Sequence, residues 1–223
     1  IYLYMAQLLE NEFISFNFIH SFINYSFIQS FIHSFIKFMK IGIGIEVKPP
    51  CVNMSSFEFV GLSENNNIYW SLQKIKNAGT VATTIILEQR ETNGKFFDLE
   101  DFLRRVPKSK VNRRVVKSLI IAGAFDNIGG AAGMPIKEPK ERFQILKHHC
   151  ELTKSDYYEE MSNENAHTNW FWTIEQKALT GFGEINFESL LMKANRKHDI
   201  KNLVNDYMSG EQFDKSKPKD FST

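Results

Sequence analysis

The spacing of apolar and polar positions between residues 71 and 94 predicts two helices separated by a tight turn. Residues 71–76 read as a short apolar and basic helix, followed by a turn at Asn77-Ala78-Gly79. A second helix is expected from residue 80 to about residue 91, capped by the Thr80 hydroxyl and ended by Asn93-Gly94. Its predicted buried stripe is Val81, Ala82, Ile85 and Ile86.

Capping residues and apolar spacing predict further helices downstream. Asp98 and Asp101 suit the first turn of a helix that Pro107 stops. Asn112 suits the N-cap of a helix that Gly123 closes, with an expected core face of Val115, Val116, Leu119 and Ile120. RFQILKHHC continues as a helix after a glycine-rich linker over residues 129–139, whereas the Pro-Pro pair in VKPPCVNMSSFEF favours extended chain. The predicted fold class is mostly α.

The N-terminal region carries a four-residue repeat, SFINYSFIQSFIHSFIKF, at residues 21–38. No Asp, Glu, Lys or Arg occurs from Phe13 to Ile36, which is long enough for a bilayer span of about 20 residues. However, polar residues such as His20, Asn24 and Gln29 follow each Phe-Ile pair, and each would need a partner in lipid. Apolar pairs at this spacing fit an amphipathic helix better than a strand.

Three interpretations of the repeat are open: membrane contact, an ordinary amphipathic helix, and expansion of a repeat in the gene. A four-base DNA repeat read in triplets returns to frame every twelve bases and therefore encodes a four-residue peptide repeat. TCA-TTC-ATT-CAT, for example, encodes Ser-Phe-Ile-His. We favour repeat expansion, which is compatible with a helix.

Composition adds a charge asymmetry that the net charge of +1 conceals. Between Leu72 and Lys117 there are 11 Lys and Arg residues against five Asp and Glu, whereas from Glu151 to the end there are nine against 13. The middle of the chain suits a polyanionic partner and the tail does not. With 223 residues, the chain has room for one or two domains. Two cysteines make no disulfide framework and no cleavable signal peptide is visible, so we expect a cytoplasmic protein.

The turn at Gly79 and the basic segment after it form the candidate functional site. Gly79 would adopt positive φ cheaply and let the backbone approach a phosphate, which the positive dipole end of the second helix could receive. A helix–glycine–helix turn is often plain structure, but seven basic residues without an acid crowd positions 104–117 and favour a nucleic-acid backbone. The predicted DNA-binding residues are Lys74, Lys76, Asn77, Gly79 and Thr80 in the hairpin, and Lys108, Ser109, Lys110, Asn112, Arg113 and Arg114 in a second basic surface.

The stretches VKPPCVN…F, LQKIKNAG…A…II…R…NGKFFDLEDFLRRV and KVNRRVVKSLIIAGAFD occur in that order from about residue 47 to residue 128. This series resembles the end of the fingers and the helix-hairpin-helix domain of the bacterial DNA polymerase III alpha subunit, the family C replicative polymerase. YMAQLLENE and MKIGIGIEV resemble the family's segments around a shorter polar helix, whose place the repeat takes. The resemblance implies that the repeat replaces or expands a helix of a cytosolic enzyme and is not a membrane anchor.

The resemblance implies three divisions of the chain. Residues 1–60 would be the end of the fingers, interrupted by the repeat, residues 61–128 the helix-hairpin-helix DNA-binding domain, and residues 129–223 a linker and helical segment leading toward an oligonucleotide-binding barrel. The chain would be a fragment of a DNA-directed DNA polymerase, a nucleotidyltransferase of bacterial or phage origin, with primer–template duplex and the replisome subunits as partners. The family's palm holds magnesium with an Asp-x-Asp motif that this chain lacks, so we expect no catalytic residue, no cofactor and no activity alone.

Other interpretations stay open at this point. A free-standing helix-hairpin-helix module would show the same basic surface, and a membrane-associated protein would need the repeat to insert. His148-His149-Cys150 lacks the spacing and the fourth ligand of a zinc site, so we expect no metal. Trp170 and Trp172 could stack on bases, but aromatic residues in an amphipathic segment more often belong to a core or an interface.

Overall fold

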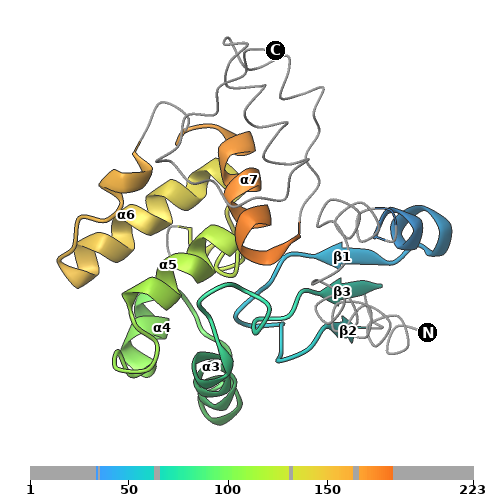
Figure 1. Cartoon of the computed structure of the whole chain (residues 1–223). Coiled ribbons are helices and arrows are strands. Elements are labelled where there is room, and N and C mark those ends of the chain that lie inside the picture. Colours follow the sequence, from blue (N-terminus) through green and yellow to red (C-terminus); the bar gives the residue numbers. More distant parts are fainter. Residues whose placement is uncertain (1–33, 35, 63–65, 131–132, 163–165, 183–223) are drawn as a thin grey trace, which may run out of the picture.

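The structure, a computed structural model, describes residues 34, 36–62, 66–130, 133–162 and 166–182 of the 223-residue chain (Figure 1). The predictions made for most of the Ser-Phe-Ile repeat, for the YMAQLLENE segment and for the tail beyond residue 182 lie outside the described residues. Within the described ranges, no helix combines the length and the apolar character that crossing a bilayer requires.

Helices dominate the described part of the chain, which confirms the mostly α fold class. The α-helices are α3 (Thr80–Asn93), α4 (Leu99–Arg105), α5 (Arg113–Ala122), α6 (Arg142–Thr153) and α7 (Asn169–Thr180). Short helical turns are η1 (Met39–Ile43), η3 (Pro139–Glu141) and η4 (Glu159–Met161). In Figure 1, α5 lies in the middle of the helical part, and both α6 and α7 pack against it.

A small sheet lies beside the helices and was not predicted from the sequence. Its strands are β1 (Glu46–Lys48), β2 (Val60–Leu62) and β3 (Asn67–Tyr69), in the order β1-β3-β2. β1 pairs parallel to β3, with Val47 opposite Ile68, and β2 pairs antiparallel to β3. Three residues are too few for an alternating pattern to stand out from coil. The extended chain expected around the Pro-Pro pair is present in part: β1 ends directly before Pro49, whereas residues 52–54 form a turn.

The helix predicted for residues 71–76 is not present, and consecutive turns take its place. Two backbone donors of this segment bind outside it. The Leu72 N–H donates to the Ser56 carbonyl at 3.0 Å, and the Lys76 N–H donates to the Leu179 carbonyl at 2.9 Å. In a helix over residues 71–76, the N–H groups of Ile75 and Lys76 would bind the carbonyls of the residues four positions earlier. They bind the Leu72 and Leu179 carbonyls instead. The helix prediction was therefore wrong because a partner distant in the sequence binds a backbone donor of this segment.

A continuous hydrophobic core joins the turn before α3 to the helices on either side of it. Its members include Ile75, Ile86, Phe102, Leu119, Leu146 and Trp172, each at most 2% exposed. Phe102 makes edge-to-face contacts with Phe96 and Phe125, with ring centroids 4.9 Å apart in both pairs. Burial of one such side chain contributes about 1.5–3 kcal/mol. The segments that carry α6 and α7 therefore share one core with α3, α4 and α5.

A buried arginine ties α6 and α7 to the carboxyl end of α5. Arg142, at the start of α6, forms an ion pair with Asp126 and donates to the Ile121 carbonyl at 3.2 Å. It also donates to the side-chain oxygen of Gln176 in α7 at 3.2 Å, and the Gln176 amide donates to the Ala122 carbonyl at 2.9 Å. The last carbonyls of a helix have no partner within it, so these bonds both satisfy α5 and fix its neighbours.

Candidate nucleic-acid interface

The turn between residues 76 and 80 carries its left-handed conformation at Asn77 rather than at Gly79. Asn77 has a φ of 74°, which Asn tolerates better than most residues that carry a Cβ. Gly79 has a φ of −1° and a ψ of 168°, so the positive φ expected there is not observed. A Cβ built on Gly79 would meet no atom within 4 Å. The backbone at Gly79 therefore borders open space, as close approach by a ligand requires.

Two hydrogen bonds fix this turn to helices far away in the sequence. The Lys76 N–H donates to the Leu179 carbonyl near the end of α7, at 2.9 Å. The side-chain amide of Asn77 donates to Ser118 Oγ in α5, at 3.0 Å. Lys76, Asn77 and Gly79 are themselves exposed. The hairpin is thus held from α5 and α7 while its outer side stays open to solvent.

The first turn of α3 has no side-chain cap, and the prediction that Thr80 would cap it was wrong. Gly79 takes the N-cap position and Thr80 is the first helical residue, with its hydroxyl accepting a hydrogen bond from the Gln73 amide at 3.0 Å. The buried stripe is also rotated relative to the prediction. Val81 is 57% exposed, whereas Thr83 is fully buried and donates its hydroxyl to the Ala78 carbonyl at 3.1 Å.

The amino end of α3 has the chemistry of an anion site. The first N–H groups of a helix have no partner within it, and the helix dipole places roughly half a positive charge at this end. α3 is 14 residues long, and its first turn contains no acidic side chain. Lys76, four residues before the first helical residue, is exposed, and Lys74 is half-buried. An oxyanion that reached Gly79 would meet backbone donors, a helix dipole and lysine charge together.

The start of α5 supplies a second basic surface, and here the predicted cap is confirmed. The Asn112 side chain accepts hydrogen bonds from the N–H groups of Arg114 and Val115, at 3.0 and 3.2 Å. The predicted core face is also confirmed, because its four members are at most 6% exposed. The preceding turn exposes three predicted residues, Lys108, Ser109 and Lys110. Because the Asn112 side chain caps the helix, its oxygen is already engaged in the free protein.

The two arginines that open α5 lie on different sides of the helix. Arg114 precedes Ser118 by four residues, so it shares the helix face whose Ser118 binds Asn77 of the hairpin. Arg113 instead lines a cavity with Cys150, Lys154 and Tyr158 at the end of α6. The structure therefore brings Arg114 toward the hairpin and places Arg113 toward α6.

Two arginines of the basic run have structural roles. Arg105 is 12% exposed in its side chain and donates to the Gln89 and Gly94 carbonyls at 2.6 and 2.7 Å, which closes the carboxyl end of α3. Arg104 pairs with Asp101 at 2.7 Å. Partial burial disfavours the Asp101 carboxylate, but hydrogen bonds from the Phe97 N–H, Arg104 and Arg105 outweigh it and lower the pKa of this carboxyl. The run is thus less available to a ligand than its seven charges suggested.

Comparisons with known proteins match the segment that contains the hairpin. A family model described as "Helix-hairpin-helix motif" matches residues 44–132. DNA polymerase III subunit alpha of Thermus aquaticus is 46% identical over 90 residues, and that of Bacillus subtilis is 43% identical over 88 residues. The protein of the same name from Borreliella burgdorferi is 34% identical over 114 residues. Residues 44–132, called the helix-hairpin-helix segment below, are therefore similar to a part of DNA polymerase III subunit alpha in these relatives.

The similarity covers a limited share of each protein. The matched stretch is 40% of this chain and 7% of the Thermus aquaticus protein, and 40% and 8% for Bacillus subtilis. For Borreliella burgdorferi the shares are 51% and 9%. The helix-hairpin-helix segment thus spans less than a tenth of the length of these relatives. It includes every residue predicted to bind DNA.

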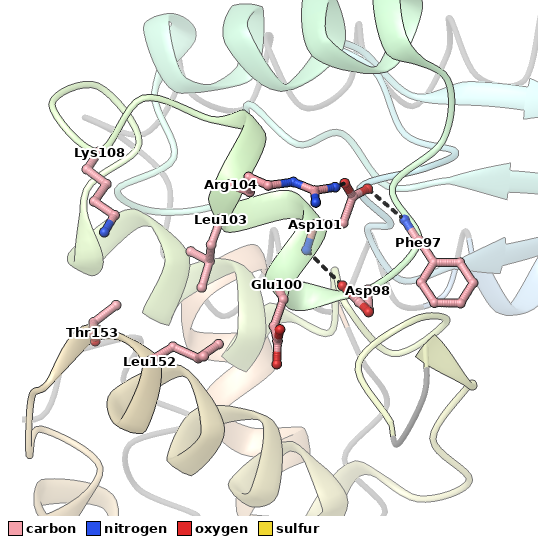
Figure 2. Close-up of a pocket in the computed structure, with 9 residues that line it drawn as sticks. All are labelled: Phe97, Asp98, Glu100, Asp101, Leu103, Arg104, Lys108, Leu152 and Thr153. Carbon is pink, nitrogen blue, oxygen red and sulfur yellow. Dashed lines mark hydrogen bonds and ion pairs between the residues drawn. The ribbon is translucent and has the colours of Figure 1, made fainter.

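A pocket lies between α4 and the end of α6, and none of the side chains that line it belongs to the hairpin. Figure 2 shows Phe97, Leu103, Lys108 and Leu152 among the side chains around it, and its volume is about 660 Å³. The dashed lines in Figure 2 mark the bonds that begin α4, where Asp98 accepts from the Asp101 N–H. Of the predicted site residues, Lys108 lines this pocket.

Residues that sequence reasoning missed hold the hairpin of the helix-hairpin-helix segment in place. Ser118 was hidden within an apolar stripe, and Leu179 acts through its backbone carbonyl, which no sequence pattern reveals. Gln73 covers the start of α3 by donating to the Thr80 hydroxyl. No sequence pattern marks Gln73 as a partner of Thr80.

Of the cysteine, histidine and tryptophan candidates, His149, Cys150 and Trp172 are buried in the packing of α6 and α7. His149 is 1% exposed, and its Nδ1 is hydrogen-bonded to the Tyr157 hydroxyl. The described residues contain no group of three or more His, Cys, Asp or Glu side chains placed to hold a metal ion. Trp172 is fully buried, and its indole N–H donates to the Ala166 carbonyl at 2.8 Å. Trp172 is therefore a core residue and is not available to stack on bases.

Proposed function

We propose that this chain binds double-stranded DNA through its phosphates and without sequence preference. The observation that carries the proposal is the amino end of α3. It is uncapped, it borders open space at Gly79, and the exposed Lys76 precedes its first helical residue by four positions. Backbone N–H groups at such an end recognise a phosphate whatever base is attached to it. The names of the relatives, all DNA polymerase III subunit alpha, support a DNA ligand.

The second basic surface would give the DNA a second point of contact with the protein. Lys110 and Arg114 are exposed, and Arg114 lies on the face of α5 whose Ser118 binds the hairpin. Two phosphate contacts held at a fixed separation suit a regular duplex better than a flexible single strand. The predicted contact residues include no aromatic side chain that could form a stacking platform for unpaired bases. We therefore propose a duplex as the ligand.

The proposal extends to the larger protein from which the chain would come. We propose that the chain is part of a replicative DNA polymerase and that it holds primer–template duplex behind the site of synthesis, beside the other replisome subunits. The proposed divisions are residues 1–60 for the end of the fingers, 61–128 for the DNA-binding domain and 129–223 for the segment leading to a barrel. The sequence contains no Asp-x-Asp pair to hold magnesium, so we assign no nucleotidyl transfer to this chain.

Fluorescence anisotropy with labelled 20-base-pair duplexes of two unrelated sequences tests the proposal. We expect equal affinities for the two, and a slope of log affinity against log salt of roughly −3 to −6, as four to six phosphate contacts would give. Lys76→Ala is expected to weaken binding and to reduce the slope by about 1. Lys95→Ala is the matched control, because Lys95 is equally exposed but lies past the far end of α3, roughly 20 Å from the hairpin along the helix.

Each alternative outcome is informative. Absence of binding at low salt, or an affinity independent of salt, would contradict phosphate recognition. Equal losses for Lys76→Ala and Lys95→Ala would place the contact somewhere other than the hairpin. A strong preference for one of the two duplex sequences would show base readout, which this surface is not built to perform.

A further inference from the structure

Asn77 combines two properties that a residue on an exposed turn rarely needs together. Its φ of 74° provides the left-handed step that turns the chain toward α3. Its side-chain amide donates to Ser118 Oγ, at 3.0 Å, across 41 residues of sequence. Ser118 is 4% exposed, so its hydroxyl is held in the packed interior of α5 and not in solvent. The hydrogen bond therefore connects an exposed turn to a rigid point of the core.

We propose that Asn77 is a positioning residue, which acts on DNA through the hairpin rather than by touching the phosphate. Its bond to Ser118 would fix the distance between the amino end of α3 and Arg114, one turn before Ser118 on the same face of α5. The hairpin and the second basic surface then form a single preorganised surface with two phosphate contacts. This inference rests on the proposed function and changes the role first predicted for Asn77.

Binding through two contacts carries an entropic cost when the hairpin must be ordered against α5. A hairpin free to move against α5 must be immobilised when both contacts engage, and that cost lowers affinity without removing a contact. The charges that meet the DNA stay the same, so the number of displaced counterions stays the same. Loss of the Asn77–Ser118 bond should therefore lower affinity by about 3- to 10-fold at fixed salt and leave the salt slope unchanged. A lysine that touches phosphate behaves differently, because its removal lowers the slope.

Ser118→Ala is the decisive variant, because it removes the hydroxyl from within α5 and alters nothing on the DNA-facing surface. Alanine is also the most favourable helix residue, so α5 should stay folded. Asn77→Gly removes the amide and keeps a residue that accepts positive φ. We expect each variant to lower duplex affinity by about 3- to 10-fold. The double variant should bind the duplex with the same affinity as the weaker-binding of the two single variants. Ser118→Thr keeps the hydroxyl and should restore most of the affinity.

A measurement without DNA separates this inference from the proposed function. Amide hydrogen exchange in the free protein reports the hydrogen-bonded N–H groups of Lys76 and Ala78 in the hairpin. Ser118→Ala should accelerate the exchange of both amides and leave the amides of α6 unchanged. Urea melts of each variant verify that the compared proteins are folded during the titrations.

Faster amide exchange in the hairpin of Ser118→Ala, together with a lower duplex affinity and an unchanged salt slope, supports the proposal. Unchanged affinity in Ser118→Ala overturns it, whether or not exchange accelerates. Additive losses in the double variant also overturn it, since they would mean that Asn77 contacts DNA independently of Ser118. If the unmodified protein binds no duplex at all, the proposed function fails first, and the positioning role fails with it.

Discussion

The guanidinium of Arg142 binds both carboxylate oxygens of Asp126, with Nε–Oδ1 at 2.9 Å and Nη2–Oδ2 at 2.5 Å. The Arg142 side chain is 2% exposed and that of Asp126 is 22% exposed. The geometry is the parallel two-bond arrangement that arginine forms with carboxylates. The pair lies where the end of α5 meets the start of α6, so it joins the helix-hairpin-helix segment to the helices beyond the matched region.

Arg142→Met is expected to lower the free energy of unfolding by about 3–5 kcal/mol, because it leaves a partly buried carboxylate without its partner. Urea denaturation at pH 7 measures this change. Arg104→Met is the matched control, since Arg104 also pairs with an aspartate but its side chain is 79% exposed, and it should cost less than about 1 kcal/mol. The double variant Asp126→Asn, Arg142→Met should be less destabilised than the sum of the two single changes. Equal effects of the two arginine variants would show that the buried pair adds nothing.

Stability should fall with pH below neutrality because of His149. Burial, together with the nearby charges of Arg113 and His148, lowers the pKa of His149 from 6.5 to about 4. Between these values the unfolded chain binds a proton that the folded chain excludes. The stabilising contribution is therefore complete above about pH 6.5 and is lost as pH falls toward 4. The total loss of stability from this shift is about 3 kcal/mol.

His149→Asn tests this dependence, because asparagine can still bond to the Tyr157 hydroxyl but does not titrate in this range. Urea melts at pH 7.5 and pH 5 should show a smaller difference for the variant than for the unmodified protein. His167→Asn is the control, since His167 is exposed and is not among the groups that lower the pKa of His149. The same pH dependence in the unmodified protein and in His149→Asn would exclude His149 as its cause.

Gly79→Val should weaken duplex binding more than Lys74→Ala does. A Cβ at residue 79 meets no atom of the protein within 4 Å, so the valine side chain would project into the space that a phosphate would fill. Alanine at Lys74 removes one solvent-screened charge, which costs less than displacing the ligand from the N–H groups of α3. Circular dichroism melts accompany the titrations, so that affinities are compared between folded proteins. Unchanged affinity in fully folded Gly79→Val would show that the hairpin is only a connection between segments.

The purified chain should extend no primer when it is supplied with magnesium and all four nucleotides. A two-metal site for nucleotidyl transfer needs carboxylates held close together, and the sequence contains no Asp-x-Asp pair. The measurement is extension of a labelled primer on a gel, with an intact replicative polymerase as the positive control. Extension that persists through successive purification steps would contradict the domain content proposed for the chain.

The elements that sequence predicted correctly are those set by neighbouring residues. Asp98 and Asn112 cap the helices that they precede, and Gly123 closes α5 with a φ of 88°. Each of these features depends on bonds within a few positions. The helix prediction for residues 71–76 failed because the Lys76 N–H binds the Leu179 carbonyl, and such a distant partner leaves no local pattern.

In the candidate site too, the sequence predicted local properties correctly and missed roles that depend on distant partners. Its charged residues were visible in the sequence, and all but half-buried Lys74 are exposed. The roles of Asn77 and Arg105 depend on partners that only the folded chain reveals, namely Ser118 for the first and the carbonyls that end α3 for the second. Sequence can therefore identify which residues face solvent here. It cannot distinguish those that hold the hairpin from those that would touch a ligand.

The bond from the Lys76 N–H to the Leu179 carbonyl has a consequence for the order in which the protein is made. Its two ends are 103 residues apart. At a synthesis rate of about 5–20 residues per second, the ribosome adds Leu179 roughly 5–20 s after Lys76. The hydrogen bond between the hairpin and α7 can therefore form only after the whole of α7 has been synthesised. The proposed DNA contact becomes complete only late in translation, well after its own residues have been added.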